Sequence, residues 1–545
     1  GPATKLDNQE RTQQTYFANV NTYLQYQLIE GLNIKTVLGA DIVDTQDYRY
    51  AGLEADSRAR SNRTILDQID LKRTSVLSET TLNYAKVIGQ HDIAAVAGLE
   101  FQKFRNRGVS TRGTNVPFGE IINYNLLAPE DITVTERDET ISRRSFFGRV
   151  NYAFDDRYLV SASVRRDGDS RFGKNNRFQT FPAVSVGWNV HNESFYNSTI
   201  LNLLNLRVST GSLGTTSDLG AYNSLSLLNP QATVFGTAFL IPSDVANANL
   251  TWQTNTETNY GTDLGFLNSR IRLGIDYYTS DIEDILINQS ISEIFGTPSI
   301  RQNSGDVRSS GLELELSASV IQKEDFSLRV GANLSTVNTE IKDLNGLDEL
   351  PRQIYGQSGR GPIFRNYVGG EIGEMWGLES EGLVEEIHMS DPTRTLGANS
   401  GEVYVKDQNG DGIIDATKTV DEGGDLVKIG QNTPDFYWGF NSSMSYKEFD
   451  FSMQWQGAQG GEVFNIDPLY WQSQFGGRLR DSFDANDDGI ADASGRHYTR
   501  ARDQTSSGIQ DASYIALRNL TIGYTLNQEL TDKAGLNSAR IVFMV

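Results

Sequence analysis

Segments in which apolar and polar side chains strictly alternate recur along this chain, and this period of two constrains the fold more than any other feature. The segment 449–456 has one apolar and one polar face, formed by Phe451, Met453 and Trp455 against Asp450, Ser452 and Gln454. Such alternation predicts a β-strand with one apolar and one hydrated face. A soluble sandwich turns the apolar face inward, whereas a membrane barrel turns it toward lipid and lines its lumen with polar residues.

Short and long connections alternate between the expected strands. Segments 19–29 and 32–42 flank the turn Glu30-Gly31, and segments 76–86 and 91–104 flank Gly89-Gln90. Long polar stretches, 48–73 and 105–142, follow these two pairs. Transmembrane barrels have this asymmetry of tight turns and long loops, whereas most connections in soluble sandwiches are short. Further strands are expected at 147–154, 158–164, 181–190, 204–210, 257–267, 270–279, 311–320, 326–337, 436–446, 514–524 and 539–545.

Composition supports a barrel over a large soluble protein. Only 38% of the 545 residues are hydrophobic, yet aromatic residues reach 10%, which argues against disorder. No run approaches the roughly 18 apolar residues of a membrane helix. The sequence therefore predicts an all-β fold, a large antiparallel transmembrane β-barrel with about 16–18 strands and long extracellular loops.

The charge and the cysteine content exclude several classes of function. The net charge of −22 disfavours nucleic acid as a partner, because phosphate binding needs the opposite sign. There is no cysteine, which excludes disulfides and thiolate metal sites. The four histidines lie far apart and no nucleotide-binding loop is present, so we expect that the protein is not an enzyme and has no organic cofactor.

Two acidic loops, 405–431 and 481–497, carry the spacing of a calcium loop. Oxygen-bearing side chains at positions 1, 3, 5 and 9, with glycine at position 6, converge on a hard cation. The residues are Asp407, Asn409, Asp411 and Asp415 with Gly412, and then Asp484, Asn486, Asp488 and Asp492 with Gly489. The bidentate acid at position 12 is missing from both loops, although Asp421 or Glu422 would replace it if the first loop folded back. A structural Ca²⁺ is one interpretation, and an Asx-rich turn is the other.

Aromatic side chains in the long loops are candidates for contacts with a substrate. Tyr355, Trp376 and Trp471 would stack on sugar rings or on peptide side chains. The alternative is that these rings anchor their own loops.

Four stretches of the chain together resemble the SusC/RagA family of TonB-dependent outer-membrane transporters. These stretches are RYLVSASVRRDGDSRFGKNNRFQTFPAVSVGWNVHNESF at 157–195, the run from Leu250-Thr251-Trp252 to Gly311-Leu312-Glu313, the acidic loop with Ile429-Gly430 and Pro434, and LRNLTIGY at 517–524. Their order and spacing match across almost the whole chain. The resemblance implies a 22-stranded barrel in the outer membrane of a Gram-negative cell. It also implies an internal plug, a SusD-like surface lipoprotein as partner, and energy supplied by the TonB complex.

The chain departs from that pattern at both ends. No plug is found in residues 1–545, and the first strands and the piece after Val545 are also missing from the pattern. Because unpaired strand edges are not viable in lipid, we expect the native protein to have more strands, or another chain to close the barrel. The expected function is active import of oligosaccharides (glycans) or peptides as a nutrient. The alternatives are a soluble or surface β-rich protein that binds or degrades glycans, and a passive pore.

Overall fold

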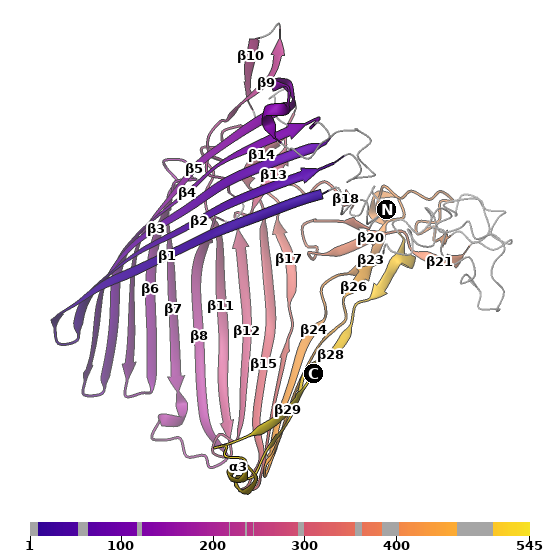
Figure 1. Ribbon diagram of the computed structural model, residues 1–545. Coiled ribbons are helices and arrows are strands. Elements are labelled where there is room, and N and C mark those ends of the chain that lie inside the picture. The colour runs from indigo at the N-terminus through magenta and orange to yellow at the C-terminus, as the bar shows by residue number, and fades with distance from the viewer. Residues whose placement is uncertain are drawn as a thin grey trace. The chain divides into compact units, whose positions relative to one another are not determined.

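The computed structural model describes residues 9–52, 64–116, 123–216, 219–234, 237–242, 245–292, 299–354, 362–383, 403–465 and 505–545. Contacts divide the chain into two units, Gly1–Val186 with Gly211–Thr254 and Leu286–Asn303, and Gly187–Thr210 with Asn255–Ile285 and Ser304–Val545. In the described ranges, none of the helices has the length and apolarity required to pass through a membrane. Seventeen of the described strands belong to one antiparallel sheet (Figure 1).

The first unit is built from long strands in consecutive antiparallel pairs, β1 to β6 (Figure 1). The turns lie where the sequence predicts them, and Gly31, Gly89, Asp155 and Asp156 have the positive φ that tight hairpin turns need. The elements are β1 (Gln9–Ile29), β2 (Leu32–Ala51), β3 (Ile65–Ile88), β4 (His91–Thr114), η1 (Tyr124–Leu126), η2 (Pro129–Asp131), β5 (Ile132–Phe154), β6 (Tyr158–Asp169), most of β7 (Phe178–Asn189), β9 (Leu228–Val234), β10 (Thr237–Pro242), β13 (Leu286–Ser290) and β14 (Ser299–Asn303).

The second unit continues with shorter strands. In it β12 pairs with β15, β15 with β16, β16 with β24, β24 with β25, and β25 with β28. Its strands in the large sheet are most of β8 (Leu201–Thr215), most of β11 (Gln253–Phe266), β12 (Ile271–Glu283), β15 (Asp306–Gln322), β16 (Phe326–Ser335), β17 (Asn338–Asp343), β24 (Phe436–Tyr446), β25 (Phe449–Gln459), β28 (Tyr514–Thr525) and β29 (Arg540–Met544). The hairpin of β24 and β25 agrees with the sequence expectation, including its turn at Lys447-Glu448.

The chain between β17 and β24 forms a small separate sheet. Its four strands are β18 (Gln353–Ile354), β19 (Ile363–Phe364), β20 (Glu374–Gly377) and β23 (Val427–Gln431). The remaining short elements are η3 (Val190–Asn192), β21 (Ser380–Leu383), β22 (Val403–Val405), η7 (Val420–Glu422), β26 (Glu462–Phe464), η8 (Ser506–Gly508), β27 (Ile509–Asp511) and α3 (Gln528–Lys533). An apolar cluster of Ile363, Leu378, Val405 and Leu426 stabilises the small sheet and the loop beside it.

The alternating strands turn their apolar face outward. Along β6, Val160 and Val164 are exposed, whereas Ser161 and Ser163 between them are partly shielded. Leu99 on β4 and Phe146 on β5 are exposed in the same way. A soluble sandwich would bury these side chains, so the pattern is that of a sheet whose outer face contacts lipid.

Several strands are longer than the alternation predicts. The polar stretches 48–73 and 105–142 are expected to be loops, but β2 continues to Ala51, β3 begins at Ile65, β4 continues to Thr114 and β5 begins at Ile132. A membrane strand needs only about 9–11 residues to cross the hydrocarbon. The 24 residues of β3 and of β4 therefore extend well beyond the bilayer, where both faces of a strand are hydrated and no alternation is required.

Candidate functional site

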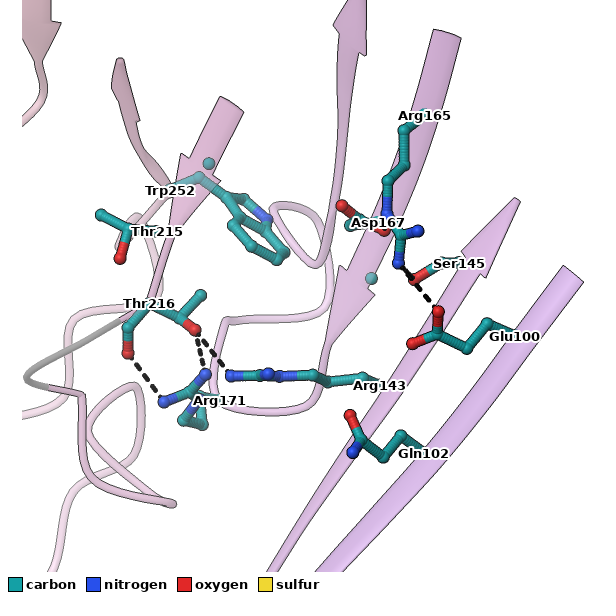
Figure 2. Close-up of a pocket in the computed structure, with 12 residues that line it drawn as sticks. Glu100, Gln102, Arg143, Ser145, Arg165, Asp167, Arg171, Thr215, Thr216 and Trp252 are labelled. Atoms are coloured by element: carbon teal, nitrogen blue, oxygen red, sulfur yellow. Dashed lines mark hydrogen bonds and ion pairs between the residues drawn. The ribbon is translucent and has the colours of Figure 1, made fainter. Parts of the chain in front are cut away.

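A polar cavity of about 420 Å³ lies in the first unit (Figure 2). Register places its side chains on one face of β4 and β5, because Glu100 lies opposite Ser145 and Gln102 lies opposite Arg143. Neighbours across strands on one face are within reach of one another. The other lining residues are Arg165, Asp167, Gly168, Arg171, Gly214, Thr215, Thr216 and Trp252.

Arg165 occupies one wall of the cavity. Its Nε donates to Asp167 Oδ1 at 2.7 Å, and its Nη2 donates to Ser145 Oγ at 2.8 Å and to Glu100 Oε2 at 3.2 Å. The guanidinium also lies 5.4 Å from the centre of the Phe147 ring. These contacts hold the charged end of Arg165 in one position at the cavity surface.

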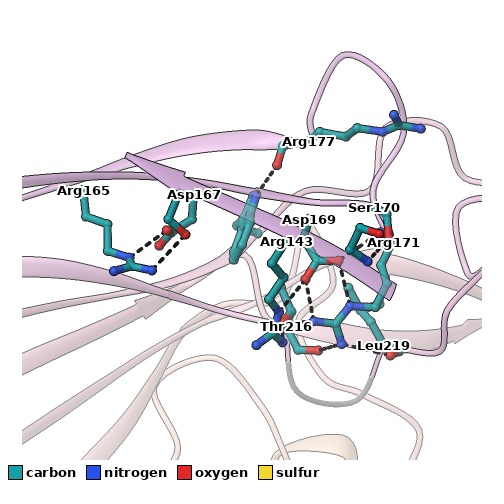
Figure 3. A network of polar contacts seen from close by, with 12 residues as sticks. Arg143, Arg165, Asp167, Asp169, Ser170, Arg171, Arg177, Thr216 and Leu219 are labelled. Carbon is teal, nitrogen blue, oxygen red and sulfur yellow. Dashed lines mark hydrogen bonds and ion pairs between the residues drawn. The ribbon is translucent and has the colours of Figure 1, made fainter. Parts of the chain in front are cut away.

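A buried ion-pair network centred on Asp169 lies beside the cavity (Figure 3). The Asp169 side chain is 0% exposed, and the Arg171 side chain is 7% exposed. Asp169 Oδ1 accepts from the backbone N and the Nε of Arg171, both at 3.0 Å. Its Oδ2 accepts from Arg171 Nη2 at 2.8 Å and from Arg143 Nε at 3.0 Å. A charge can be buried when an opposite charge and hydrogen bonds offset its loss of hydration, and Asp169 and Arg171 meet both conditions.

The same arginines fasten the chain that follows β8 to the end of β6. Arg171 Nη1 donates to the carbonyl oxygens of Thr216 at 2.7 Å and Leu219 at 3.2 Å. The Thr216 hydroxyl accepts from Arg171 Nη2 and, at 3.1 Å, from Arg143 Nη2. Segments more than 40 residues apart in sequence therefore share one set of hydrogen bonds.

Trp252 forms the apolar edge of the cavity and is only 5% exposed. Its ring centre lies 4.9 Å from that of Phe172 and 5.6 Å from that of Phe181, and its indole N–H donates to the carbonyl oxygen of Arg177 at 3.2 Å. The cluster around it comprises Phe172, Phe181, Leu219, Leu250, Trp252 and Leu286. Trp252 therefore stabilises the wall and offers little ring surface for stacking.

Two further polar cavities lie in the second unit. One, of about 580 Å³, is lined by Arg270, Arg272 and Arg329 together with Glu315, and the other, of about 410 Å³, includes His191. Their linings come from the polar faces of the strands, as in the first cavity. We take the cavity beside Asp169 as the principal candidate site, because buried ion pairs hold its charged groups in place.

Trp376, a predicted substrate contact, lies on β20 of the small sheet. Its indole N–H donates to Glu374 Oε2 at 2.9 Å, and the Arg365 guanidinium lies 4.2 Å from the ring centre. Tyr367 packs against the ring edge to face at 5.9 Å. These contacts favour the interpretation that Trp376 anchors its own loop, and the substrate contact stays a prediction. Tyr355 and Trp471, the other two predicted contacts, lie outside the described residues.

A second charged network ties the small sheet to the acidic loop. Glu349 accepts from Arg365 Nη2 at 2.7 Å and from Arg352 Nε at 2.9 Å, and Arg352 Nη2 donates to Glu422 Oε2 at 2.7 Å. The hydrogen bond from Arg352 and that from the Thr419 backbone lower the pKa of Glu422 from 4.5 to about 2. The carboxylate of Glu422 is thus committed to this network.

The acidic loop folds back on itself. Asp407 Oδ1 accepts from the Gly410 N–H at 2.7 Å and Oδ2 from the Gly412 N–H at 2.8 Å. The buried Asp425, and neither Asp421 nor Glu422, is the acid that returns to the loop, where it accepts from the backbone N of Gln408 at 2.8 Å and of Asp415 at 2.7 Å.

These contacts describe an Asx-rich turn, the alternative to a calcium loop. Each carboxylate oxygen that accepts one N–H keeps a second lone pair, so the turn does not exclude a cation. Within the described ranges, no group of three or more acidic or histidine side chains is arranged to hold a metal. Asp407, Asn409, Asp411 and Asp415 as calcium ligands therefore stay a prediction. Asp484, Asn486, Asp488 and Asp492 of the second loop lie outside the described residues.

Sequence reasoning did not identify Arg143, Asp169, Arg171 or Thr216 as site residues. The stretch RRDGDSRFG contains two of them, but it served only as a mark of family resemblance. Three arginines and two aspartates within nine residues are a local signal for an ion-pair network. Arg143 and Thr216 carry no such signal, because folding alone brings them to Asp169.

Comparisons with known proteins give one consistent result. The family described as TonB dependent receptor-like, beta-barrel, matches residues 2–538. The TonB-dependent receptor P3 of Formosa agariphila is 29% identical over 557 residues, which cover 98% of this chain and 53% of the relative. The TonB-dependent receptor SusC of Bacteroides thetaiotaomicron is 28% identical over 459 residues, which cover 82% of this chain and 43% of the relative.

A solved structure agrees with the fold. The RagAB peptide transporter superposes with a TM-score of 0.79 at 23% identity, over 99% of this chain and 58% of that chain. The chain spans about half the length of the curated relatives it matches. The outward apolar faces, the antiparallel sheet and the match over residues 2–538 lead to one conclusion: the chain belongs to the TonB-dependent receptor family of outer-membrane β-barrels and is of the SusC/RagA type.

Proposed function

We propose that the protein is an active importer and that this chain is its transport barrel. The observation that carries the proposal is the family match over residues 2–538, together with a polar cavity whose charged groups are held by buried ion pairs. Transport requires binding that is strong enough for entry and weak enough for release, which many polar contacts supply. The proposed transport makes and breaks no covalent bond, so we propose a transporter and not an enzyme, as the TonB-dependent relatives support.

The proposed cargo is an oligosaccharide or a peptide that is too large to diffuse through a porin. The similarity to the RagAB peptide transporter supports a peptide cargo, and the oligosaccharide stays the second proposed cargo. The proposed partners are a SusD-like surface lipoprotein, which captures the substrate, and the TonB complex, which supplies energy through a plug. The chain covers only 53% of the P3 relative. The cargo and the partners are therefore proposed for the whole protein, of which this chain is the barrel.

Gentle purification of the native complex tests the partners. The outer membrane is dissolved in mild detergent, the protein is isolated, and everything that accompanies it is identified by mass spectrometry. We expect a stoichiometric lipoprotein, and peptides that map outside residues 1–545. If the protein were isolated alone from intact membranes, the importer with a lipoprotein lid would be refuted.

Uptake in living cells separates the importer from a passive pore. We expect growth on the cognate oligomer to need both this protein and an intact TonB gene. Uptake that persists at the same rate after deletion of TonB would instead favour the pore.

A further inference from the structure

Two of the three arginines that line the cavity beside Asp169 are more exposed than the acids around them, in a chain whose net charge is −22. The side chains of Arg143 and Arg165 are each 40% exposed. The acids close to them are far more covered, with Glu100 at 18%, Asp167 at 21% and Asp169 at 0%. A ligand in the cavity therefore meets guanidinium groups more than carboxylates.

The cavity also keeps unused hydrogen-bond donors. Arg165 binds its acid partners through Nε and Nη2, whereas Arg143 binds Asp169 through Nε and the Thr216 hydroxyl through Nη2. Among the described residues, the Nη1 group of each arginine has no hydrogen-bond partner. Gln102, which lies beside Arg143 in Figure 2, likewise makes no side-chain hydrogen bond within the described part of the chain. A charged Nη1 group keeps two N–H donors, each of which can make a charge-assisted hydrogen bond to a carboxylate oxygen.

The acids nearby hold the two arginines in position through Nε or Nη2 and leave the Nη1 groups available. Asp167 and Glu100 hold Arg165 from two sides, and Asp169 holds Arg143. A donor that is already positioned loses little conformational entropy when a ligand binds. The volume of about 420 Å³ is within the range of small-molecule sites, which is about 300–1,000 Å³.

We infer that this cavity binds a carboxylate group of the transported substrate, so that the protein selects acidic over neutral oligomers. The carboxylate would accept from the Nη1 groups of Arg143 and Arg165 and from the Gln102 amide. An acidic sugar unit and an acidic peptide side chain both present this group. The inference rests on the proposed function, because it names the substrate chemistry of that same barrel.

Binding by the purified full-length protein in detergent tests the inference without transport. Isothermal titration would compare an oligogalacturonate with a neutral oligogalactoside, and a glutamate-rich peptide with its glutamine counterpart. We expect the acidic member of at least one pair to bind at least about tenfold more tightly, with an affinity that falls as salt rises. The pair that discriminates identifies the source of the carboxylate, and equal binding within both pairs would overturn the inference.

Position 102 provides opposite variants at one site. Gln102→Glu places a negative charge among the arginines and should weaken binding of the acidic oligomer about tenfold, whereas Gln102→Arg should strengthen it. The control Gln179→Glu makes the same change at an exposed position of β7 that does not line the cavity, and should have no effect. If both variants at position 102 folded and bound like the wild type, the assignment of the site would be wrong.

The two proposals fail in different ways. Growth and uptake that do not depend on TonB would refute the importer but would leave the titration result intact. Equal affinity for acidic and neutral oligomers would refute the carboxylate site while the importer stands.

Discussion

The buried pair of Asp169 and Arg171 should dominate the local stability of the cavity wall. In Asp169→Asn, the amide nitrogen would face Arg171 Nη2 and Arg143 Nε, so two of the four hydrogen bonds that the carboxylate accepts would be lost. A hydrogen bond to a charged group contributes about 1.5–3 kcal/mol, which gives about 3–6 kcal/mol. Removal of one partner of a buried ion pair costs a similar amount, about 3–5 kcal/mol.

Hydrogen exchange measures this loss where it occurs. A loss of about 4 kcal/mol raises the population of the open state about a thousandfold. Amide protons in the peptide 165–177 should then exchange about a thousand times faster, while those of the β24–β25 hairpin keep their rates. The matched control is Glu136→Gln, which removes a carboxylate from an exposed pair with Arg107 and should cost at most about 1 kcal/mol. Equal exchange in Asp169→Asn and the wild type would refute the reasoning.

Three other perturbations test separate parts of the structure. Gly98→Ala should destabilise the fold by about 1–3 kcal/mol in urea unfolding, because the new methyl meets the Phe147 ring, whereas Gly148→Ala has room and should be neutral. The pKa of Glu422 is lowered from 4.5 to about 2, so its contribution to stability is present above pH 4.5 and is lost as pH falls to about 2. The rate of proteolysis within the segment 403–431 should therefore rise as pH falls from 4.5 to about 2. A constant rate over this range would contradict the prediction. If the first acidic loop binds calcium, chelation should speed cleavage there and Asp407→Asn should abolish the difference.

The sequence predicts the membrane-spanning part of this fold best. The turns at Glu30-Gly31 and Lys447-Glu448 are correct because lipid on one side and water on the other impose alternation on the strands beside them. The outer half of β5, 132–143, was expected to be loop. Nine of these twelve side chains are polar, because both faces lie in water. Alternation does not continue past Thr135, so only pairing with β4 reveals the strand.

The candidate site was less accessible to sequence reasoning. Arg143 and Thr216 are 73 residues apart and meet only in the folded chain. Trp376 was chosen because exposed loop aromatics stack on ligands, but no sequence pattern indicated that Arg365 lies over its ring. The sequence raises a fold-back of the acidic loop only as a condition, with Asp421 or Glu422 as the returning acid. The acid that returns is Asp425, which lies outside the twelve-residue pattern.

The unbroken register of the long hairpins limits how such a protein can change during evolution. From Ile88 opposite His91 to Ile65 opposite Thr114, β3 and β4 pair without a single shift. One residue inserted beside the turn at Gly89 would reverse the two faces of everything beyond it and bring charged side chains into lipid. The same insertion beyond Thr114 would disturb no pair. Length variation among descendants of this chain should therefore accumulate at the ends of the strands farthest from the tight turns, where new recognition surfaces can arise without any change to the part that crosses the membrane.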